Sequence, residues 1–158
     1  MEEDYEHNIG FLLHDVARHL RTIYDRRMAP LGLTRAQWWV LNHLYFHEGI
    51  SQSELALLLE TEKASLGRLL DRMQAKGWIT RRQDKKDKRT KRVYLTKKVQ
   101  PTLQVMRDLA GVTRDEAVKS LSQEERTALM GMLRRMRDDL FVINSAESNP
   151  DSQREMTE

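Results

Sequence analysis

The fold prediction depends first on residues 63–96, which read KASLGRLLDRMQAKGWITRRQDKKDKRTKRVYLT. This stretch opens with an apolar stripe at helical spacing, formed by Leu66, Leu69, Leu70 and Met73. Gly77 is expected to end this helix, with Trp78 packing against Met73 in a Schellman arrangement. Residues 79–83 are expected to form a short strand. Residues 92–95, which alternate polar and apolar side chains, are expected to be its partner across a polar loop at 84–90. This pattern predicts a two-stranded hairpin.

The sequence before this stretch predicts two more short helices. Ser51 and Glu54 have the spacing of a capping box, and the apolar residues from Leu55 to Leu59 allow a helix of about two turns. Another capping-box spacing, Thr34 to Gln37, is expected to begin a helix that runs to Glu48. A short capped helix, a polar break at 60–62, a second helix and a basic hairpin are together typical of a winged helix-turn-helix.

Longer amphipathic segments flank this region. Residues 5–29 and 96–120 each carry a helical stripe, and Pro101 fits the second stripe if the regular helix begins near it. A sixth helix is expected after the cap at 122–125, and the polar tail 145–158 is expected to be disordered. We therefore predict a mainly α fold with a small β-hairpin wing: a winged helix-turn-helix domain at 33–96, and a helical dimerisation region at 5–32 and 97–144.

Positive charge is concentrated in the hairpin. The whole chain has a net charge of +3, but residues 81–98 hold ten Lys or Arg against two Asp. Such a patch suits the phosphate backbone of nucleic acid, because neutralised phosphates release their counterions. The chain lacks cysteine, long apolar runs and a signal-like start, so we expect a cytoplasmic protein without membrane contact.

Candidate DNA contacts follow from the polar face of residues 61–72. Arg68 can bond both acceptors of a guanine, and Thr61 and Ser65 lie beside it on the same face. In the loop, Lys88 and Arg89 are candidates for a narrow minor groove, with Asp87 orienting Arg89. The candidate phosphate contacts are Ser51, Ser53, Lys63, Arg72, Arg82, Lys91 and Arg92.

These pieces, in this order, resemble the MarR/SlyA family of bacterial regulators. The matching motifs are LGLT at 31–34, LLDRM at 69–73, KGWI at 76–79, DKR at 87–89 and VYLT at 93–96. The resemblance implies a two-fold dimer built by the first, fifth and sixth helices, a pseudo-palindromic operator, and a repressor released by a small phenolic or aromatic acid. The family's wing usually opens with Asp-Pro and carries two arginines at its tip. Lys85 and Lys88 depart from that pattern, and Lys85 predicts a more mobile wing.

An effector site is expected where the first, second and fifth helices meet. Trp38 and Trp39 can stack on an aromatic ring, and His14, Arg18 or Arg21 can meet a carboxylate. The expected effector is an aromatic carboxylate or its coenzyme A ester. No cofactor is expected.

Two other functions stay open at this point. His43 and His47, four residues apart, are a weak metal-ligand pair, so a metal-responsive regulator of the same fold is one alternative. A winged-helix architectural or interaction module is the other. An enzyme is not expected, because no acid pair, nucleophile–base set or phosphate-binding glycine loop is evident.

Overall fold

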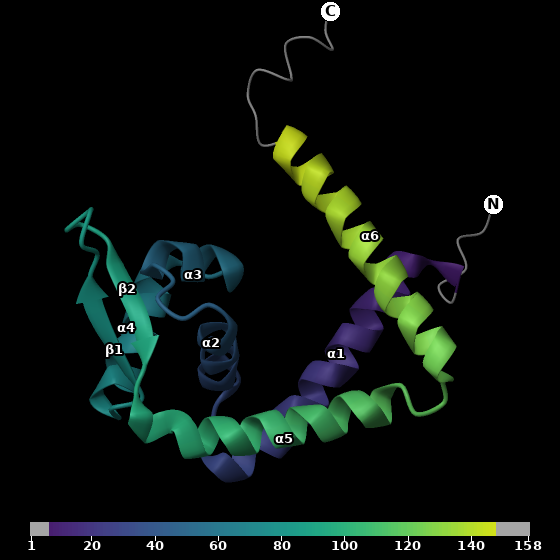
Figure 1. Ribbon diagram of the computed structural model, residues 1–158, viewed down its shortest axis with the longest axis horizontal. Coiled ribbons are helices and arrows are strands. Elements are labelled where there is room, and N and C mark those ends of the chain that lie inside the picture. Colours follow the sequence, from purple (N-terminus) through teal and green to yellow (C-terminus); the bar gives the residue numbers. More distant parts are fainter. Residues whose placement is uncertain (1–6, 148–158) are drawn as a thin grey trace, which may run out of the picture. The chain divides into compact units, whose positions relative to one another are not determined.

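The computed structural model describes residues 7–147. The chain divides into two compact units, Met1–Arg114 and Asp115–Glu158. In chain order, the described elements are α1 (Ile9–Met28), η2 (Ala29–Leu31), α2 (Arg35–Phe46), α3 (Gln52–Leu58), α4 (Lys63–Ala75), β1 (Ile79–Gln83), β2 (Lys91–Leu95), η3 (Lys97–Val99), α5 (Gln100–Ala117) and α6 (Gln123–Glu147). In the first unit, α2, α3 and α4 pack beside the hairpin of β1 and β2 (Figure 1). The predicted fold class is confirmed.

Side-chain caps set the starts of the short helices. The Thr34 hydroxyl accepts from the Gln37 amide at 3.4 Å, and the Gln37 side chain accepts from the Thr34 amide at 3.1 Å. Ser51 and Glu54 exchange the equivalent bonds at 2.9 and 3.1 Å. Both predicted capping boxes are present, and each satisfies amides that the first helical turn leaves unpaired. α2 ends at Phe46 rather than at Glu48.

The break between α3 and α4 is a tight turn. Glu60 adopts a left-handed φ of 47°, and the Thr61 amide bonds to the Ala56 carbonyl at 3.0 Å. At the other end of α4, Gly77 has a φ of 72°. The Gly77 amide donates to the Gln74 carbonyl at 2.8 Å, and the Trp78 amide donates to the Met73 carbonyl at 3.0 Å. This is the predicted Schellman ending, which turns the chain directly into β1.

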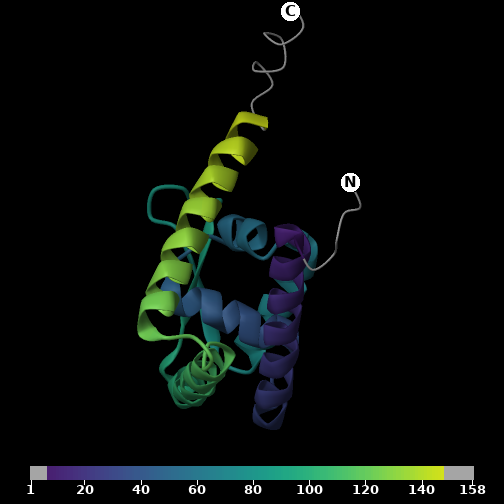
Figure 2. The ribbon, with the colours of Figure 1, turned by 90° about the vertical axis from the view of Figure 1, so that its right-hand side faces the viewer.

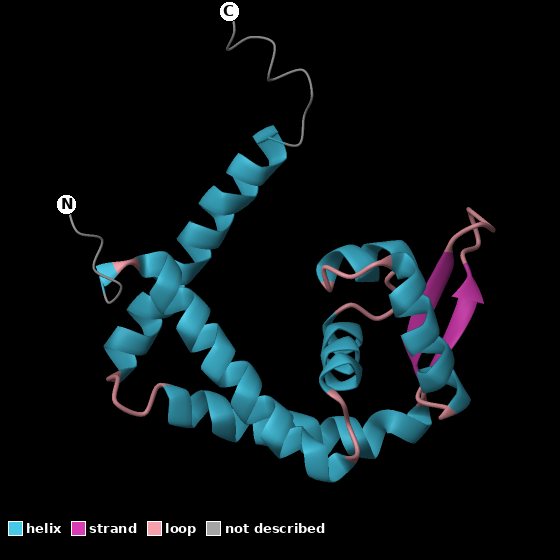
Figure 3. Ribbon diagram, turned by 180° about the vertical axis from the view of Figure 1, so that it is seen from behind, coloured by secondary structure: helices cyan, strands magenta, loops and turns pink. Residues whose placement is uncertain are grey.

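β1 and β2 form an antiparallel pair in which Ile79 lies opposite Leu95 and Gln83 opposite Lys91. β2 therefore begins one residue before the expected Arg92. Ile79 and Val93 are buried, whereas Arg82 and Lys91 are exposed. The loop at the tip of the hairpin extends away from the helices of its own unit (Figure 3).

One hydrophobic core holds the first unit together. The side chains of α4 that are buried in it are the four predicted from periodicity: Leu66, Leu69, Leu70 and Met73. They pack with buried side chains of α2 and α3, with Ile79 and Val93 of the hairpin, and with Val99, Leu103 and Met106. Burying one face of α4 leaves its other face available to solvent.

The regular part of α5 begins at Gln100, after the 3₁₀ turn η3, which places Pro101 in the first helical turn. Proline is tolerated there because the amide it lacks would have no helical partner. α5 ends at Ala117 instead of the expected Ser120.

α6 is one unbroken helix (Figure 2, green to yellow). It begins at the predicted cap, where Ser122 and Glu125 exchange bonds of 2.7 and 3.2 Å. It continues to Glu147, so residues 145–147 are helical and not part of a disordered tail. Ala146 and Glu147 are strong helix formers, which accounts for the extension. The rest of the expected tail, 148–158, lies outside the described residues. Across the described part of the chain, no helix combines the length and apolarity needed to span a membrane.

Candidate nucleic-acid interface

The solvent side of α4 carries the side chains expected to contact bases. Arg68 is exposed, and its Nη2 donates to the Ser65 hydroxyl at 3.2 Å. Thr61 and Ser65 are half-buried, and the small side chain of Ala64 is exposed. Lys63 and Arg72 are exposed at the two ends of this face. Small residues around a long cation leave α4 free to approach a groove closely while Arg68 reaches toward base edges.

Arg81 is a functional side chain that the sequence analysis missed. Its guanidinium donates to the Asp71 carboxylate at 2.5 Å and to the Gln74 side chain at 2.8 Å. Arg81 belongs to β1, whereas Asp71 and Gln74 belong to α4, so these bonds fix the hairpin against the helix. The sequence signal was an arginine ten residues after Asp71, but the contact between them depends on the turn at Gly77.

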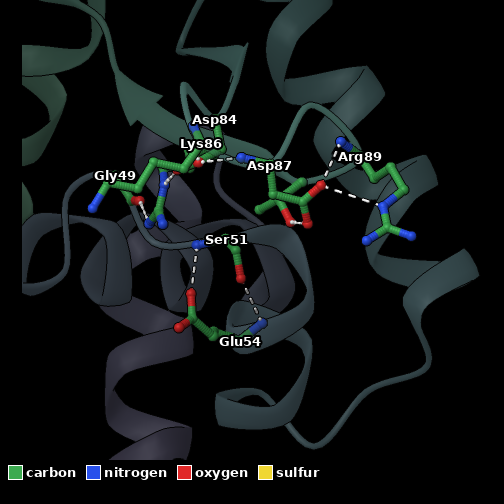
Figure 4. A network of polar contacts seen from close by, with 9 residues as sticks. Gly49, Ser51, Glu54, Asp84, Lys86, Asp87 and Arg89 are labelled. Atoms are coloured by element: carbon green, nitrogen blue, oxygen red, sulfur yellow. Dashed lines mark hydrogen bonds and ion pairs between the residues drawn. The ribbon is translucent and has the colours of Figure 1, made fainter.

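The wing loop is organised by two aspartates (Figure 4). Asp87 accepts from the Arg89 amide at 3.0 Å, from the Arg89 Nε at 3.3 Å and from the Thr90 hydroxyl at 3.1 Å. The Arg89 side chain is nevertheless 93% exposed. Asp87 therefore holds the backbone amide and the Nε of Arg89, while the Arg89 side chain still projects into solvent beside the exposed Lys88.

Asp84 closes the beginning of the loop. Its carboxylate accepts from the amides of Lys86 at 2.7 Å and Asp87 at 2.9 Å, and it is ion-paired with Arg92. The Arg92 guanidinium and the two loop amides hold the pKa of Asp84 down at about 2. Donation by the Arg89 amide is the main cause of the lowered pKa of Asp87. With Lys85 where the family usually has proline, these charged hydrogen bonds hold the turn.

At the base of the hairpin, the three candidate phosphate contacts Arg82, Lys91 and Arg92 lie in different environments. Lys91 is exposed, and Arg82 lies over the Tyr94 ring with its guanidinium 5.0 Å from the ring centroid. Both remain accessible to phosphates. Arg92 differs from both, because its Nη1 donates to the Gly49 carbonyl at 2.9 Å and its Nε donates to Asp84.

The two serines near α3 also differ. The Ser51 hydroxyl oxygen accepts from the Glu54 amide in the cap of α3, and Ser51 is only 7% exposed, so burial keeps its hydroxyl away from a bound duplex. Ser53 is exposed on the first turn of the same helix. Exposure therefore separates the two serines as candidate phosphate contacts.

A cavity of about 350 Å³ lies between α1, α2 and α5. Its aromatic wall contains Tyr24, Trp38, Trp39, Tyr45 and Phe46.

The cations of this cavity come from α5 and not from α1. Arg107 and Arg114 line it, and the Arg107 guanidinium lies 4.0 Å from the centroid of the Tyr45 ring. His14, Arg18 and Arg21 do not line the cavity. Arg18 instead binds Asp15 at 3.0 Å. The structure therefore brings the predicted tryptophans together with cations that the sequence analysis did not name.

Trp38 is almost fully buried, and its Nε1 donates to Asp25 at 2.9 Å. The same Asp25 accepts from Arg35, and this bond is the largest cause of its lowered pKa. Trp39 is 38% exposed. It also lines a second hollow of about 410 Å³ between α2 and α4, together with Thr61, Ser65 and Arg72.

The histidine pair of α2 does not form a metal centre with other described residues. The His43 and His47 rings are nearly parallel, with centroids 6.4 Å apart, but residues 7–147 contain no cluster of three or more His, Cys, Asp or Glu side chains able to hold a metal. His43 packs edge-on against Trp39, and its buried Nε2 has no hydrogen-bond partner. Burial, followed by the charge of His47, lowers the pKa of His43.

Comparisons with known proteins place this geometry in a family. The sequence profile of the MarR family matches residues 31–90. The crystal structure of the transcriptional regulator PA3341 is 31% identical, with a TM-score of 0.76 over 84% of this chain and 98% of that one. Apo MarR from E. coli is 29% identical, with a TM-score of 0.71 over 82% of this chain and 96% of that one.

The chain belongs to the MarR family. MarR-family proteins are transcription regulators rather than enzymes, and α3, α4 and the hairpin are the winged helix-turn-helix of this MarR-family chain. A similar structure, a cysteine-to-serine mutant of E. coli MarR, was solved in complex with operator DNA. It is 29% identical, with a TM-score of 0.68 over 81% of this chain and 92% of that one.

Proposed function

We propose that this MarR-family chain represses transcription as a homodimer on a pseudo-palindromic operator and releases that operator when a small aromatic carboxylate binds. The observation that carries the proposal is the pairing of two exposed arginines in one braced unit: Arg68 on α4 and Arg89, 93% exposed, at the wing. Arg81 fixes the hairpin that carries Arg89 against the helix that carries Arg68.

The proposed DNA site has three parts. Thr61, Ser65 and Arg68 read base edges in the major groove, where a bidentate arginine distinguishes guanine from the other bases. Lys88 and Arg89 enter the adjacent minor groove, whose narrow form concentrates negative potential. The backbone contacts are Ser53, Lys63, Arg72, Arg82 and Lys91, which position the protein without reading sequence. Ser51 is left out because it is buried, and Arg92 because its guanidinium bonds to Gly49 and Asp84.

Pairing of two chains is supported by apolar side chains that each unit leaves exposed. In α1 these are Ile9, Phe11, Leu12 and Val16, which are 45–62% exposed. In the second unit, α6 has no buried residue, and Phe141, Val142 and Ile143 are all more than half exposed. A two-fold dimer buries such surfaces and spaces two recognition helices about 34 Å apart, one turn of DNA. We assign 33–96 to DNA binding and 5–32 with 97–144 to dimerisation.

The chemistry of the 350 Å³ cavity supports an aromatic acid as effector. Tyr24, Trp38 and Trp39 offer ring faces and edges, and Arg107 and Arg114 offer the only Lys or Arg side chains among its lining residues. An aromatic wall with a few placed cations is typical of a small-molecule site. The cavity lies at the small end of the range for ligand sites, about 300–1,000 Å³, which favours the free acid over its coenzyme A ester.

The test is fluorescence anisotropy on a labelled duplex from the region upstream of the protein's own gene, with unlabelled random duplex as competitor. We expect preference for the specific duplex, one dimer per site by light scattering, and a steep loss of affinity with added salt. Binding with no sequence preference would instead support an architectural module. Adding a panel of aromatic acids to the preformed complex then tests release.

A further inference from the structure

Arg92 occupies an unusual place for a wing cation. It lies opposite Arg82 in the hairpin, and on its other side it forms an isolated β-bridge with Ser51. Its side chain is 39% exposed, far less than that of Arg89. β2 thus pairs with β1 along one edge and with the turn between α2 and α3 along the other.

The Arg92 side chain joins these two edges. Its Nη1 donates to the Gly49 carbonyl at 2.9 Å, in the turn that follows α2. Its Nε donates to the Asp84 carboxylate, at the start of the wing loop. The Asp84 side chain is only 15% exposed. Without Arg92, its carboxylate oxygen would therefore lose a donor and have limited access to water in its place.

The backbone attaches only the root of the wing. The Gly49 amide bonds to the Val93 carbonyl, and the Val93 amide to the Ile50 carbonyl, both at 3.0 Å. Toward the tip, the loop is closed on itself by Asp84 and Thr90, whose backbone groups bond at 2.9 Å. The Arg92 side chain connects that closed loop to the helix-turn-helix, because it bonds to Asp84 on one side and to the Gly49 carbonyl on the other.

We infer that Arg92 is a positioning residue for DNA recognition: by bracing Asp84 against Gly49 it sets the angle of the wing, and so the place that Arg89 reaches. It is not a phosphate contact. This inference rests on the proposed function, because it assigns a role within the proposed wing–groove contact.

A double-mutant cycle tests the role, using a labelled duplex selected by the wild-type protein from a random pool. We expect Arg92→Ala to weaken binding about tenfold in the wild-type background, but less than about twofold when Arg89 is already alanine. Lys91→Ala is the matched control, and its loss should be the same in both backgrounds because it contacts phosphate directly.

The conservative variant separates a brace from a charge. Lysine keeps the positive charge but lacks the fork that holds two acceptors, so Arg92→Lys should weaken binding about as much as Arg92→Ala. Asp84→Asn keeps an oxygen for the loop amides and loses the ion pair, so it should weaken binding in the same direction. Wild-type affinity in Arg92→Lys, or a full additive loss in the Arg89→Ala background, would overturn the inference.

Amide hydrogen exchange without DNA tests the brace independently of the proposed function. Exchange at Lys86, Asp87 and Thr90 should accelerate in Arg92→Lys, while the melting temperature stays close to that of the wild type. Unchanged exchange rejects the brace. Accelerated exchange in a chain that binds no duplex keeps the brace as a structural feature, and rejects both its recognition role and the proposed function.

Discussion

The Arg81 guanidinium lies 2.5 Å from the Asp71 carboxylate, across the turn that joins α4 to β1. Arg81 is only 19% exposed, whereas Asp71 is 63% exposed, so the pair is screened by solvent mainly on its acidic side. The guanidinium also holds the Gln74 side chain at 2.8 Å. Arg81 therefore adds a polar connection between α4 and the wing to the packing of their shared core.

Replacing Arg81 should loosen that junction. We expect Arg81→Ala to lower the free energy of unfolding by about 1 kcal/mol, since it loses a partly buried ion pair and the packing of its stem. Urea unfolding followed by circular dichroism measures this change. Arg82→Ala, on the exposed side of the same strand, is the matched control and should change stability by less than about 0.5 kcal/mol. Equal losses from the two variants would contradict the assignment.

Replacing Arg68 should relax sequence preference. Its loss removes a proposed bidentate base contact, so Arg68→Ala should cost about 1–3 kcal/mol of binding and flatten the preference at one base position. Binding-site selection from a random pool measures the preference. Lys91→Ala should weaken binding to all sequences alike and reduce the salt slope by about 1. An unchanged preference profile in Arg68→Ala would mean that α4 is not the reading helix.

The proposed effector site predicts which arginine matters. Arg107 lines the cavity and Arg21 does not, although both are arginines of helices that border it. Benzoate-type acids at about 100 times their dissociation constant should stabilise the native chain by about 2.7 kcal/mol. This stabilisation raises the melting temperature. We expect Arg107→Ala to abolish the rise and Arg21→Ala to retain it. The reverse pattern would place the carboxylate at the N-terminal helix, as the sequence alone had suggested.

His43 should give the stability a pH dependence. Its pKa is lowered in the folded chain by burial and by His47, so the unfolded chain takes up the proton first as the pH falls. The stabilisation from neutral His43 is present above its unfolded pKa, about 6.5, and is lost as the pH falls from there toward the lower folded pKa. His43→Phe should flatten this slope in urea titrations, and His47→Gln should reduce it. A steeper slope in His43→Phe would show that the sign is wrong.

Local patterns were sufficient for most of the fold. The caps at Thr34 and Ser51, the Schellman ending at Gly77 and the buried face of α4 all depend on residues within seven positions of one another. Interactions of that range leave a pattern in the sequence, because helical and strand periodicity place the partners on a known face.

The side-chain roles that the sequence analysis missed depend on longer-range contacts. Arg92 meets a carbonyl 43 positions earlier, so no local rule could tell it from the exposed Lys91 beside it. Arg107 meets Tyr45 because α5 packs beside α2, and the stripe of α5 shows which face is buried but not what faces it. The cavity was expected at the junction of these helices, but the arginines that line it could not be chosen before the helices were placed.

Trp39 is a common wall of two hollows, one among α1, α2 and α5, the other against Thr61, Ser65 and Arg72 of the DNA-binding face. If a molecule in the first hollow displaces this indole and weakens the grip on an operator, reciprocity requires the operator to weaken the hold on that molecule by an equal factor. Titrating the acid into free and operator-bound protein would then give two dissociation constants whose ratio measures the coupling between the two sites. The same ratio in Trp39→Ala would show how much of that coupling passes through the indole.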